Sequence, residues 1–306
     1  MITIRVPATT ANLGSGFDVF GLALKLYLTI RVRETSGPLS IIYRGRGVGE
    51  VPVDERNLIW RAYQWVIERE GKRGPHLVIE IENEIPLARG LGSSGAAIVA
   101  GVMAADAVCQ LGLSDERLLA HALALEPHPD NITAALVGGF VACCVTDEGR
   151  TLYASLPISP DIKAIIVVPD FELPTREARA VLPDRYSRED AVFNLQRVAL
   201  LATALQHPHP DLVAEAMRDR WHQPYRQALI PGLEEILQLT SMPGLLGVSL
   251  SGAGPSVLAL AIDNFEQIGQ NIQFQFSRHG IQSEVLILEI ERRGAVIETG
   301  GERLEK

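Results

Sequence analysis

The sequence predicts a protein of two α+β domains, each with helices on one face of a largely antiparallel sheet. The chain has 306 residues, which corresponds to about two domains of ordinary size. Strand and helix patterns mix along it without the strict alternation that a parallel sheet requires. Pro157 and Pro160 bracket a plausible boundary. We therefore expect domains at 1–160 and 161–306.

Patterns typical of strands and helices divide the first 160 residues. Strands are expected where apolar and polar residues alternate or short apolar runs occur, at 2–6, 22–34, 39–43, 77–81 and 140–145. Helices are expected where apolar residues recur at helical spacing, at 57–70, 96–109 and 115–126. Asp54 or Asn57 can cap the first helix and Ser114 the third, because their side-chain oxygens accept from free N–H groups.

The second half gives the same mixture of patterns. Strands are expected at 164–168, 246–250, 257–262 and 285–290. Helices are expected at 189–206, 211–221 and 265–277. The tail from Glu291 is polar, and we expect it to be loosely held.

Composition limits the possible partners and compartments. Lys and Arg number 28 against 37 Asp and Glu, a net charge of −9, which disfavours binding to nucleic-acid phosphates. Cys109, Cys143 and Cys144 show no metal-binding spacing, so buried thiols in a reducing cytoplasm are expected. The uncharged stretch 240–262 holds too many glycines and prolines for a spanning helix. The N-terminal residues lack the pattern of a signal peptide. We expect a soluble, cytoplasmic protein.

The strongest local motif is the glycine and serine loop at 86–96. It precedes a helix, where free backbone N–H groups at the positive helix end bind phosphate readily. Its three glycines permit close approach of the backbone, and Ser93 and Ser94 add hydroxyls. Ala96 and Ala97 stand where a Walker A loop has Lys and Ser or Thr. The loop is thus either a phosphate site of another type or a plain strand–helix turn.

Three further motifs combine polar groups with turn-forming residues. Residues 11–18 place Asn and Asp around glycines, 126–131 hold two carboxylates, an imidazole and an amide, and 250–256 form a glycine turn. Each could also be a structural turn, and for 250–256 taken alone a hairpin turn is favoured. His207 and His209 are flanked by prolines, which favours a solvated loop over a metal site.

Taken in order, these motifs resemble those of the GHMP kinases, the superfamily of galactokinase, homoserine kinase, mevalonate kinase and phosphomevalonate kinase. The matching segments are VPATTANLGSGFDVFG, PLARGLGSSGA, HPDNITAALVGG and LSGAGPSVLAL. The glycine and serine loop marks the superfamily, whereas the first motif, the HPDN segment and HQPYRQALIPG at 222–232 are similar to the homoserine kinases in particular. The resemblance implies an N-terminal domain like the second domain of ribosomal protein S5 and a ferredoxin-like C-terminal domain.

The resemblance also implies an activity. Homoserine kinases transfer the γ-phosphoryl group of ATP to the side-chain hydroxyl of L-homoserine, with Mg²⁺, on the way to threonine. A homodimer is implied as well. The same motifs leave open another small-molecule kinase of the mevalonate or shikimate type, or a non-catalytic nucleotide sensor. RNA binding by an S5-like fold is a further alternative, which the charge disfavours.

The nucleotide end of the site follows from the resemblance. The phosphates would be wrapped by Pro86, Leu87, Ala88, Arg89, Gly90, Leu91, Gly92, Ser93, Ser94, Gly95 and Ala96. Ser94 and Glu126 match the residues on the metal side, where Mg²⁺ needs few protein oxygens. Asn57 matches an adenine contact, although it could equally be a helix cap. Pro127 replaces the glycine usual in the family, which puts the placement of Glu126 in doubt.

The substrate end would recognise an amine, a carboxylate and a hydroxyl. By the resemblance, Asp18 pairs with the amine, while Arg179 and Arg226 hold the carboxylate. Thr175 shares a face with Arg179 if that segment is helical. The residues expected around the hydroxyl are Asn12, His128 and Asn131. The residues expected at the reacting groups are Asn12, Arg179, Asn131 and Asp130. Asp130 could be the general base. Alternatively no base is needed, because phosphoryl transfer requires little proton removal early in the reaction.

Overall fold

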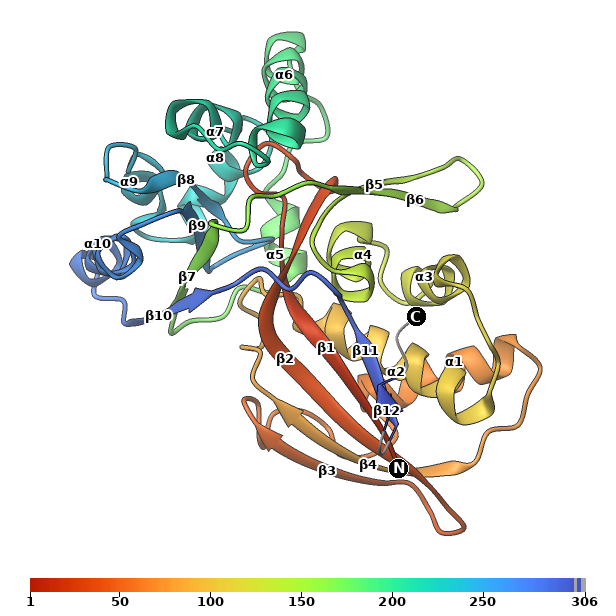
Figure 1. Ribbon diagram of the computed structural model, residues 1–306. Coiled ribbons are helices and arrows are strands. Elements are labelled where there is room, and N and C mark those ends of the chain that lie inside the picture. Colours follow the sequence, from red (N-terminus) through yellow and green to blue (C-terminus); the bar gives the residue numbers. More distant parts are fainter. Residues whose placement is uncertain (300–301, 304–306) are drawn as a thin grey trace.

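The chain folds around two β-sheets (Figure 1). The structure is a computed structural model, and it describes residues 1–299 and 302–303. The first sheet has eight strands and the second has four. Helices pack on both, so the α+β prediction is confirmed. The sheets meet where β1 ends and the turn between β8 and β9 begins, and this junction forms the candidate site.

The first sheet is antiparallel except for one pair of strands. Its order is β12-β11-β1-β2-β4-β3, with β5 and β6 continuing from β2, and only β3 and β4 run parallel. The long hairpin of β1 and β2 pairs Ile2 with Val32 and Ala11 with Gly21. The strands are β1 (Ile2–Ala11), β2 (Phe20–Thr35), β3 (Ser40–Gly45), β4 (His76–Asn83), β5 (Phe140–Val145), β6 (Thr151–Leu156), β11 (Val296–Thr299) and β12 (Glu302–Arg303).

Four helices cover one face of this sheet (Figure 1). They are α1 (Leu58–Arg69), α2 (Ser93–Cys109), α3 (Asp115–Leu123) and α4 (Pro129–Val137). Helix α2 is apolar on nearly every side because it packs against α1, α3, α4 and the sheet. Gly101 allows α1 to approach, since a Cβ atom there would lie 2.3 Å from the carbonyl oxygen of Ile59. This close packing fixes the N-terminus of α2 over the sheet.

The second sheet has the order β10-β7-β9-β8, and all of its strands are antiparallel. This order and the helical crossovers confirm the ferredoxin-like fold. Its strands are β7 (Lys163–Pro169), β8 (Leu245–Leu250), β9 (Val257–Ala261) and β10 (Ser283–Leu288). The helices of this half are α5 (Thr175–Ala180), α6 (Arg188–Ala204), α7 (Pro210–Ala216), α8 (Gln223–Arg226), the 3₁₀ helix Gln227–Leu229, α9 (Leu233–Leu237) and α10 (Phe265–Arg278). Helix α6 protrudes from the molecule (Figure 1).

Two expectations about the elements were wrong. The tail is not loose throughout, because β11 pairs with β1 and buries part of Ile297 against the core; residues 300, 301 and 304–306 lie outside the described residues. The helix expected at 211–221 ends at Ala216, since Asp219 draws the following backbone into a turn. Residues 129–131 form the first turn of α4, a helix that the sequence patterns did not predict; proline at the first helical position favours this start.

The cysteines and the apolar stretch give smaller findings. Cys143 is buried as expected, whereas Cys109 is partly buried and Cys144 is exposed near the end of β5. The segment 240–262 forms strands β8 and β9, not a helix. Within the part of the chain that the structure describes, no helix is both long and apolar enough to span a bilayer. The proposed boundary at 160 stays a prediction; the second sheet lies within 163–288, whereas β11 returns to the first sheet.

Candidate functional site

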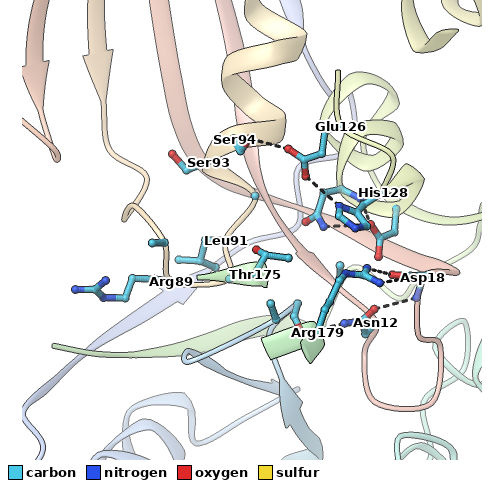
Figure 2. A pocket seen from close by; sticks show the side chains of 18 of the residues that line it. Asn12, Asp18, Arg89, Leu91, Ser93, Ser94, Glu126, His128, Thr175 and Arg179 are labelled. Atoms are coloured by element: carbon cyan, nitrogen blue, oxygen red, sulfur yellow. Dashed lines mark hydrogen bonds and ion pairs between the residues drawn. The ribbon is translucent and has the colours of Figure 1, made fainter. Parts of the chain in front are cut away.

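The four motifs meet in one cavity at the junction of the two sheets (Figure 2). Every expected substrate-side residue lines it, together with most of the glycine and serine loop. Its lining residues are Ala11, Asn12, Asp18, Pro86, Ala88, Arg89, Gly90, Leu91, Gly92, Ser93, Ser94, Glu126, His128, Asp130, Asn131, Thr175, Arg179, Arg226, Gly252 and Ala253. Residues as distant in sequence as Ala11 and Ala253 thus share one pocket.

The loop at 86–96 enters helix α2 through a left-handed glycine. Gly92 precedes the helix with φ 67°, and a Cβ atom there would lie 2.0 Å from Thr9 Oγ1. A larger residue would therefore push the loop off β1. No side chain caps α2, so its first N–H groups are available to an anion. The Ser251 hydroxyl donates to the Gly90 carbonyl at 2.7 Å, which ties the loop to the second sheet.

Arg89 reinforces that connection and points away from the centre of the cavity (Figure 2). Its Nε donates to the carbonyl of Pro169 at 3.1 Å, and its Nη1 lies 3.4 Å from a Glu172 carboxylate oxygen. Arg89 therefore joins the loop to the end of β7. Arg89 therefore has protein partners of its own, whether or not it also contacts a phosphate.

Ser94 and Glu126 form an oxygen pair at one end of the cavity. The Ser94 hydroxyl donates to Glu126 Oε2 at 2.6 Å, and His128 Nδ1 lies 3.6 Å from Glu126 Oε1 (Figure 2). Burial acts to raise the pKa of Glu126, but interactions with His128 and Ser94 lower it overall, so the carboxylate is charged. Glu126 reaches Ser94 despite Pro127. A hydroxyl and a carboxylate are hard oxygen ligands that fit Mg²⁺.

Asp130 and Asn131 lie at the start of α4, beneath the same loop. Asp130 Oδ1 accepts from the Asn131 backbone N–H at 2.7 Å and from its amide at 3.1 Å. Thr9 Oγ1 donates to Asn131 Oδ1 at 2.7 Å. Burial, together with the negative charge of Asp18, raises the pKa of Asp130 to about 7. The two acidic groups of this motif, Glu126 and Asp130, therefore differ in charge near neutrality.

Asn12 and Asp18 come from the loop that joins β1 and β2. Both have left-handed backbone conformations, with φ 72° and 55°, which Asn and Asp tolerate better than most other residues. Asn12 Oδ1 accepts from the Asp18 backbone N–H at 3.0 Å, and Asn12 Nδ2 donates to the Gly252 carbonyl at 2.9 Å. Asn12 therefore fixes both the position of Asp18 and the distance to the second sheet.

Arg179 and Arg226 bring cations to this loop from the second half of the chain. Arg179, on α5, donates to both carboxylate oxygens of Asp18, at 3.0 and 2.5 Å (Figure 2). Arg226 is 1% exposed and donates to the carbonyls of Ala178 and Gly252 at 2.9 and 3.1 Å. Burial and the neighbouring Arg179 lower the pKa of Arg226 to about 10, so it stays charged at neutral pH. Thr175 and Arg179 lie on one helix, as expected.

Four of the expected site residues lie outside the cavity lining. Asn57 is confirmed as the cap of α1, since its Oδ1 accepts from Ile59 N–H at 3.0 Å and its amide donates to Pro52. Leu87, Gly95 and Ala96 do not line the cavity either. An adenine contact of Asn57 stays a prediction. Across residues 1–299 and 302–303, no cluster of three or more His, Cys, Asp or Glu could hold a metal. His207 and His209 are exposed in the segment that precedes α7.

Three residues that support the site had no role assigned from the sequence. Thr9, Ser251 and Gly252 lie within the quoted motifs, and they hold the loops together through the contacts above. His222, behind Arg226, was also missed, although it opens the HQPYRQALIPG segment. Contacts across more than 120 residues, such as Thr9 to Asn131, leave no spacing that a single sequence reveals.

The raised pKa of Asp130 predicts a pH-dependent stability. An unfolded aspartate titrates near pH ~3.9, so between about pH 4 and about pH 7 the folded state binds more protons and stability falls as pH rises. Asp130→Asn should remove this contribution, whose limiting slope is about 1.4 kcal/mol per pH unit. Urea unfolding from about pH 5 to about pH 8 measures it. Asp147→Asn, at an exposed loop, is the control. Parallel wild-type and Asp130→Asn curves would contradict the assignment.

Comparison with known proteins agrees with this geometry. Residues 57–139 match the model of the GHMP kinases N terminal domain, and 201–279 match that of the GHMP kinases C terminal region. The chain is 47% identical to a homoserine kinase of Solibacter usitatus over 95% of both chains, and 45% identical to one of Persephonella marina over 97% and 98%. A crystal structure of homoserine kinase from Cytophaga hutchinsonii superposes with a TM-score of 0.84 at 30% identity, covering 97% of both chains. The chain belongs to the GHMP kinases and, within them, to the homoserine kinase family.

Proposed function

We propose that this protein transfers the γ-phosphoryl group of ATP to the side-chain hydroxyl of L-homoserine. The observation that carries the proposal is the bidentate pair of Asp18 and Arg179, which shares a cavity with the glycine and serine loop. The loop suits a polyphosphate. The Asp18–Arg179 pair offers one negative and one positive group, which suits a small molecule with both an ammonium and a carboxylate group.

A free amino acid can enter this pair by exchanging partners with it. Its ammonium group would replace the guanidinium on Asp18, while its carboxylate would take Arg179 and Arg226. Each charge keeps an opposite charge throughout, so no buried charge is left unpaired. The planar guanidinium of Arg179 already makes two parallel hydrogen bonds to a carboxylate, which is the geometry that a substrate carboxylate would reproduce. Thr175 adds a hydroxyl beside it.

Ser94 and Glu126 are the residues that would hold Mg²⁺ beside the loop. When bound, the ion would neutralise phosphate charge that develops during transfer. One hydroxyl and one carboxylate are sufficient, because Mg²⁺ takes its other ligands from phosphate and water. Glu126 is charged for this purpose, as its lowered pKa indicates. The N-terminus of α2 contributes backbone N–H groups to the same phosphates.

His128 and Asn131 would orient the hydroxyl that accepts the phosphoryl group, with Asn12 beside them. Asp130 contributes mainly by holding Asn131, since Asp130 Oδ1 already accepts two hydrogen bonds from that residue. The loose transition state of phosphoryl transfer places little demand on early proton removal. We therefore propose catalysis by positioning and charge stabilisation without a dedicated base. Membership of the family also supports a homodimer, a cytoplasmic location and a role in threonine biosynthesis.

Two alternatives are less well supported by the same residues. A mevalonate- or shikimate-type substrate has no amine, so it gives Asp18 no partner. Mevalonate kinase of L. major shares the fold at a TM-score of 0.70 and 17% identity, which says nothing about substrate. A non-catalytic sensor would have no need of Ser94 and Glu126 in contact at the loop.

Release of ADP tests the proposal directly. Purified protein with Mg-ATP is assayed with L-homoserine, L-serine, mevalonate, galactose and shikimate. We expect turnover with L-homoserine, and not with the alcohols that lack an amino-acid zwitterion. Turnover on one of those alcohols would overturn the substrate assignment while leaving the ATP loop in place. Nucleotide binding without any turnover would favour the sensor.

Asp130→Asn tests the absence of a base. The amide oxygen can still accept from Asn131, so we expect most of the kcat to remain. Glu126→Gln, which removes the charge beside Ser94, should lower kcat much more. Steady-state kinetics at saturating ATP and L-homoserine measures both variants. A loss of ~10⁴-fold or more in Asp130→Asn would instead identify Asp130 as the general base.

A further inference from the structure

His222 is a fully buried histidine that lies behind the substrate end of the cavity without lining it. It precedes the short helix α8. Its backbone is held by Asp219, whose carboxylate accepts from the N–H groups of Trp221, His222 and Gln223 at 2.8, 2.9 and 2.7 Å. The Asn194 amide donates to the same carboxylate at 2.8 Å. Burial acts to raise the pKa of Asp219, but the His222 ring, whose Nε2 lies 3.6 Å from Asp219 Oδ2, and these donors lower it overall.

The two ring nitrogens of His222 have partners that specify one tautomer. Nε2 lies 2.9 Å from the Gly14 carbonyl, which only accepts, so Nε2 carries the proton. Nδ1 lies 3.1 Å from Arg226 Nη1, which only donates, so Nδ1 is an acceptor. Burial lowers the pKa of His222 against the opposing effect of Asp219, in agreement with a neutral ring. A proton on Nδ1 would point at the Arg226 guanidinium, which also only donates, so the Nδ1–H form is unfavourable.

Through these nitrogens His222 joins two parts of the site that come from different sheets. Gly14 belongs to the loop that carries Asn12 and Asp18. Arg226 contacts the Gly252 carbonyl, as does Asn12, and donates to Ala178 on the helix that carries Arg179. The ring also packs against Phe17, with centroids 5.2 Å apart, and both arginines lie over Phe17.

We infer that His222 is a positioning residue for the amino-acid substrate: its two ring nitrogens hold Arg226 at a fixed distance from the loop that carries Asp18. This inference rests on the proposed function, since the distance between Arg226 and Asp18 matters only for a ligand that carries both an ammonium and a carboxylate group. In the proposed function, ATP occupies the other end of the cavity, at the glycine and serine loop. Loss of His222 should therefore affect recognition of L-homoserine and leave that of ATP unchanged.

Three substitutions separate the two ring contacts. His222→Ala removes both. His222→Asn keeps an oxygen near the position of Nδ1, so it can still accept from Arg226, whereas His222→Gln keeps an N–H group near the position of Nε2 for Gly14. We expect His222→Ala to raise KM for L-homoserine roughly ten- to a hundredfold, as for lost hydrogen bonds to a charged group. The other two variants should be intermediate, with kcat lowered less and KM for ATP unchanged in all three.

His121→Asn is the matched control. His121 is a nearly buried histidine whose Nε2 contacts Glu70 at 2.7 Å, far from the cavity. It should lose stability without any change in KM for L-homoserine. A purely structural role for His222 predicts that its variants raise both KM values alike, or lower only the melting temperature. Either result would overturn the inference. If His222→Ala does not fold, the Asn and Gln variants carry the same test.

The ¹⁵N chemical shifts of the ring give a readout that needs no turnover. In the wild type we expect a neutral Nε2–H tautomer at about neutral pH, assigned by its loss in His222→Asn. A charged ring or the Nδ1–H tautomer would contradict the inference even if the kinase assay succeeds. Wild-type protein that shows the expected tautomer but does not phosphorylate L-homoserine would instead contradict the proposed function.

Discussion

The carbonyl oxygen of Gly252 is the point on which the site depends. It accepts from Asn12 of the first sheet's loop and from Arg226 of the second half of the chain, while the Gly252 N–H donates to the Ala11 carbonyl. Gly252 thereby joins elements of the two halves, next to the contacts that Ser251 and Arg89 make between them. Because Asn12 also binds the backbone of Asp18, a change here would separate the acidic and basic ends of the cavity. The left-handed conformations of Asn12 and Asp18 persist because these contacts hold them.

Environment gives similar side chains different properties within this one cavity. Glu126 stays charged because His128 and Ser94 outweigh its burial, whereas the more deeply buried Asp130, near Asp18, has a raised pKa. The charged carboxylate is the one beside the glycine and serine loop. The other supports Asn131 through hydrogen bonds. A division of this kind fits an enzyme that works by placing charge rather than by moving a proton early.

Sequence patterns predicted the fold class and most elements, and the family resemblance predicted nearly all of the cavity lining. Local sequence signals predicted the loop that leads into α2 and the Asn57 cap of α1, because each depends on residues that are close in sequence. They failed where a distant segment decides the outcome. Strand β11 forms because the edge of β1 offers it hydrogen bonds, and no pattern near Glu291 reveals that edge. Likewise, the family resemblance predicted that Asp18 and Arg179 bind the charged groups of the substrate. It did not predict that they pair with each other, because they lie 161 positions apart in the sequence.

The proposed substrate specificity depends on recognition of the substrate amine by Asp18. Isothermal titration calorimetry of L-homoserine and of 4-hydroxybutanoate, which lacks the amine, with wild type and Asp18→Asn tests it most directly. The comparison of two ligands cancels any general disturbance of Arg179. We expect the substitution to weaken L-homoserine roughly ten- to a hundredfold and 4-hydroxybutanoate much less. Equal weakening of both ligands would contradict the claim.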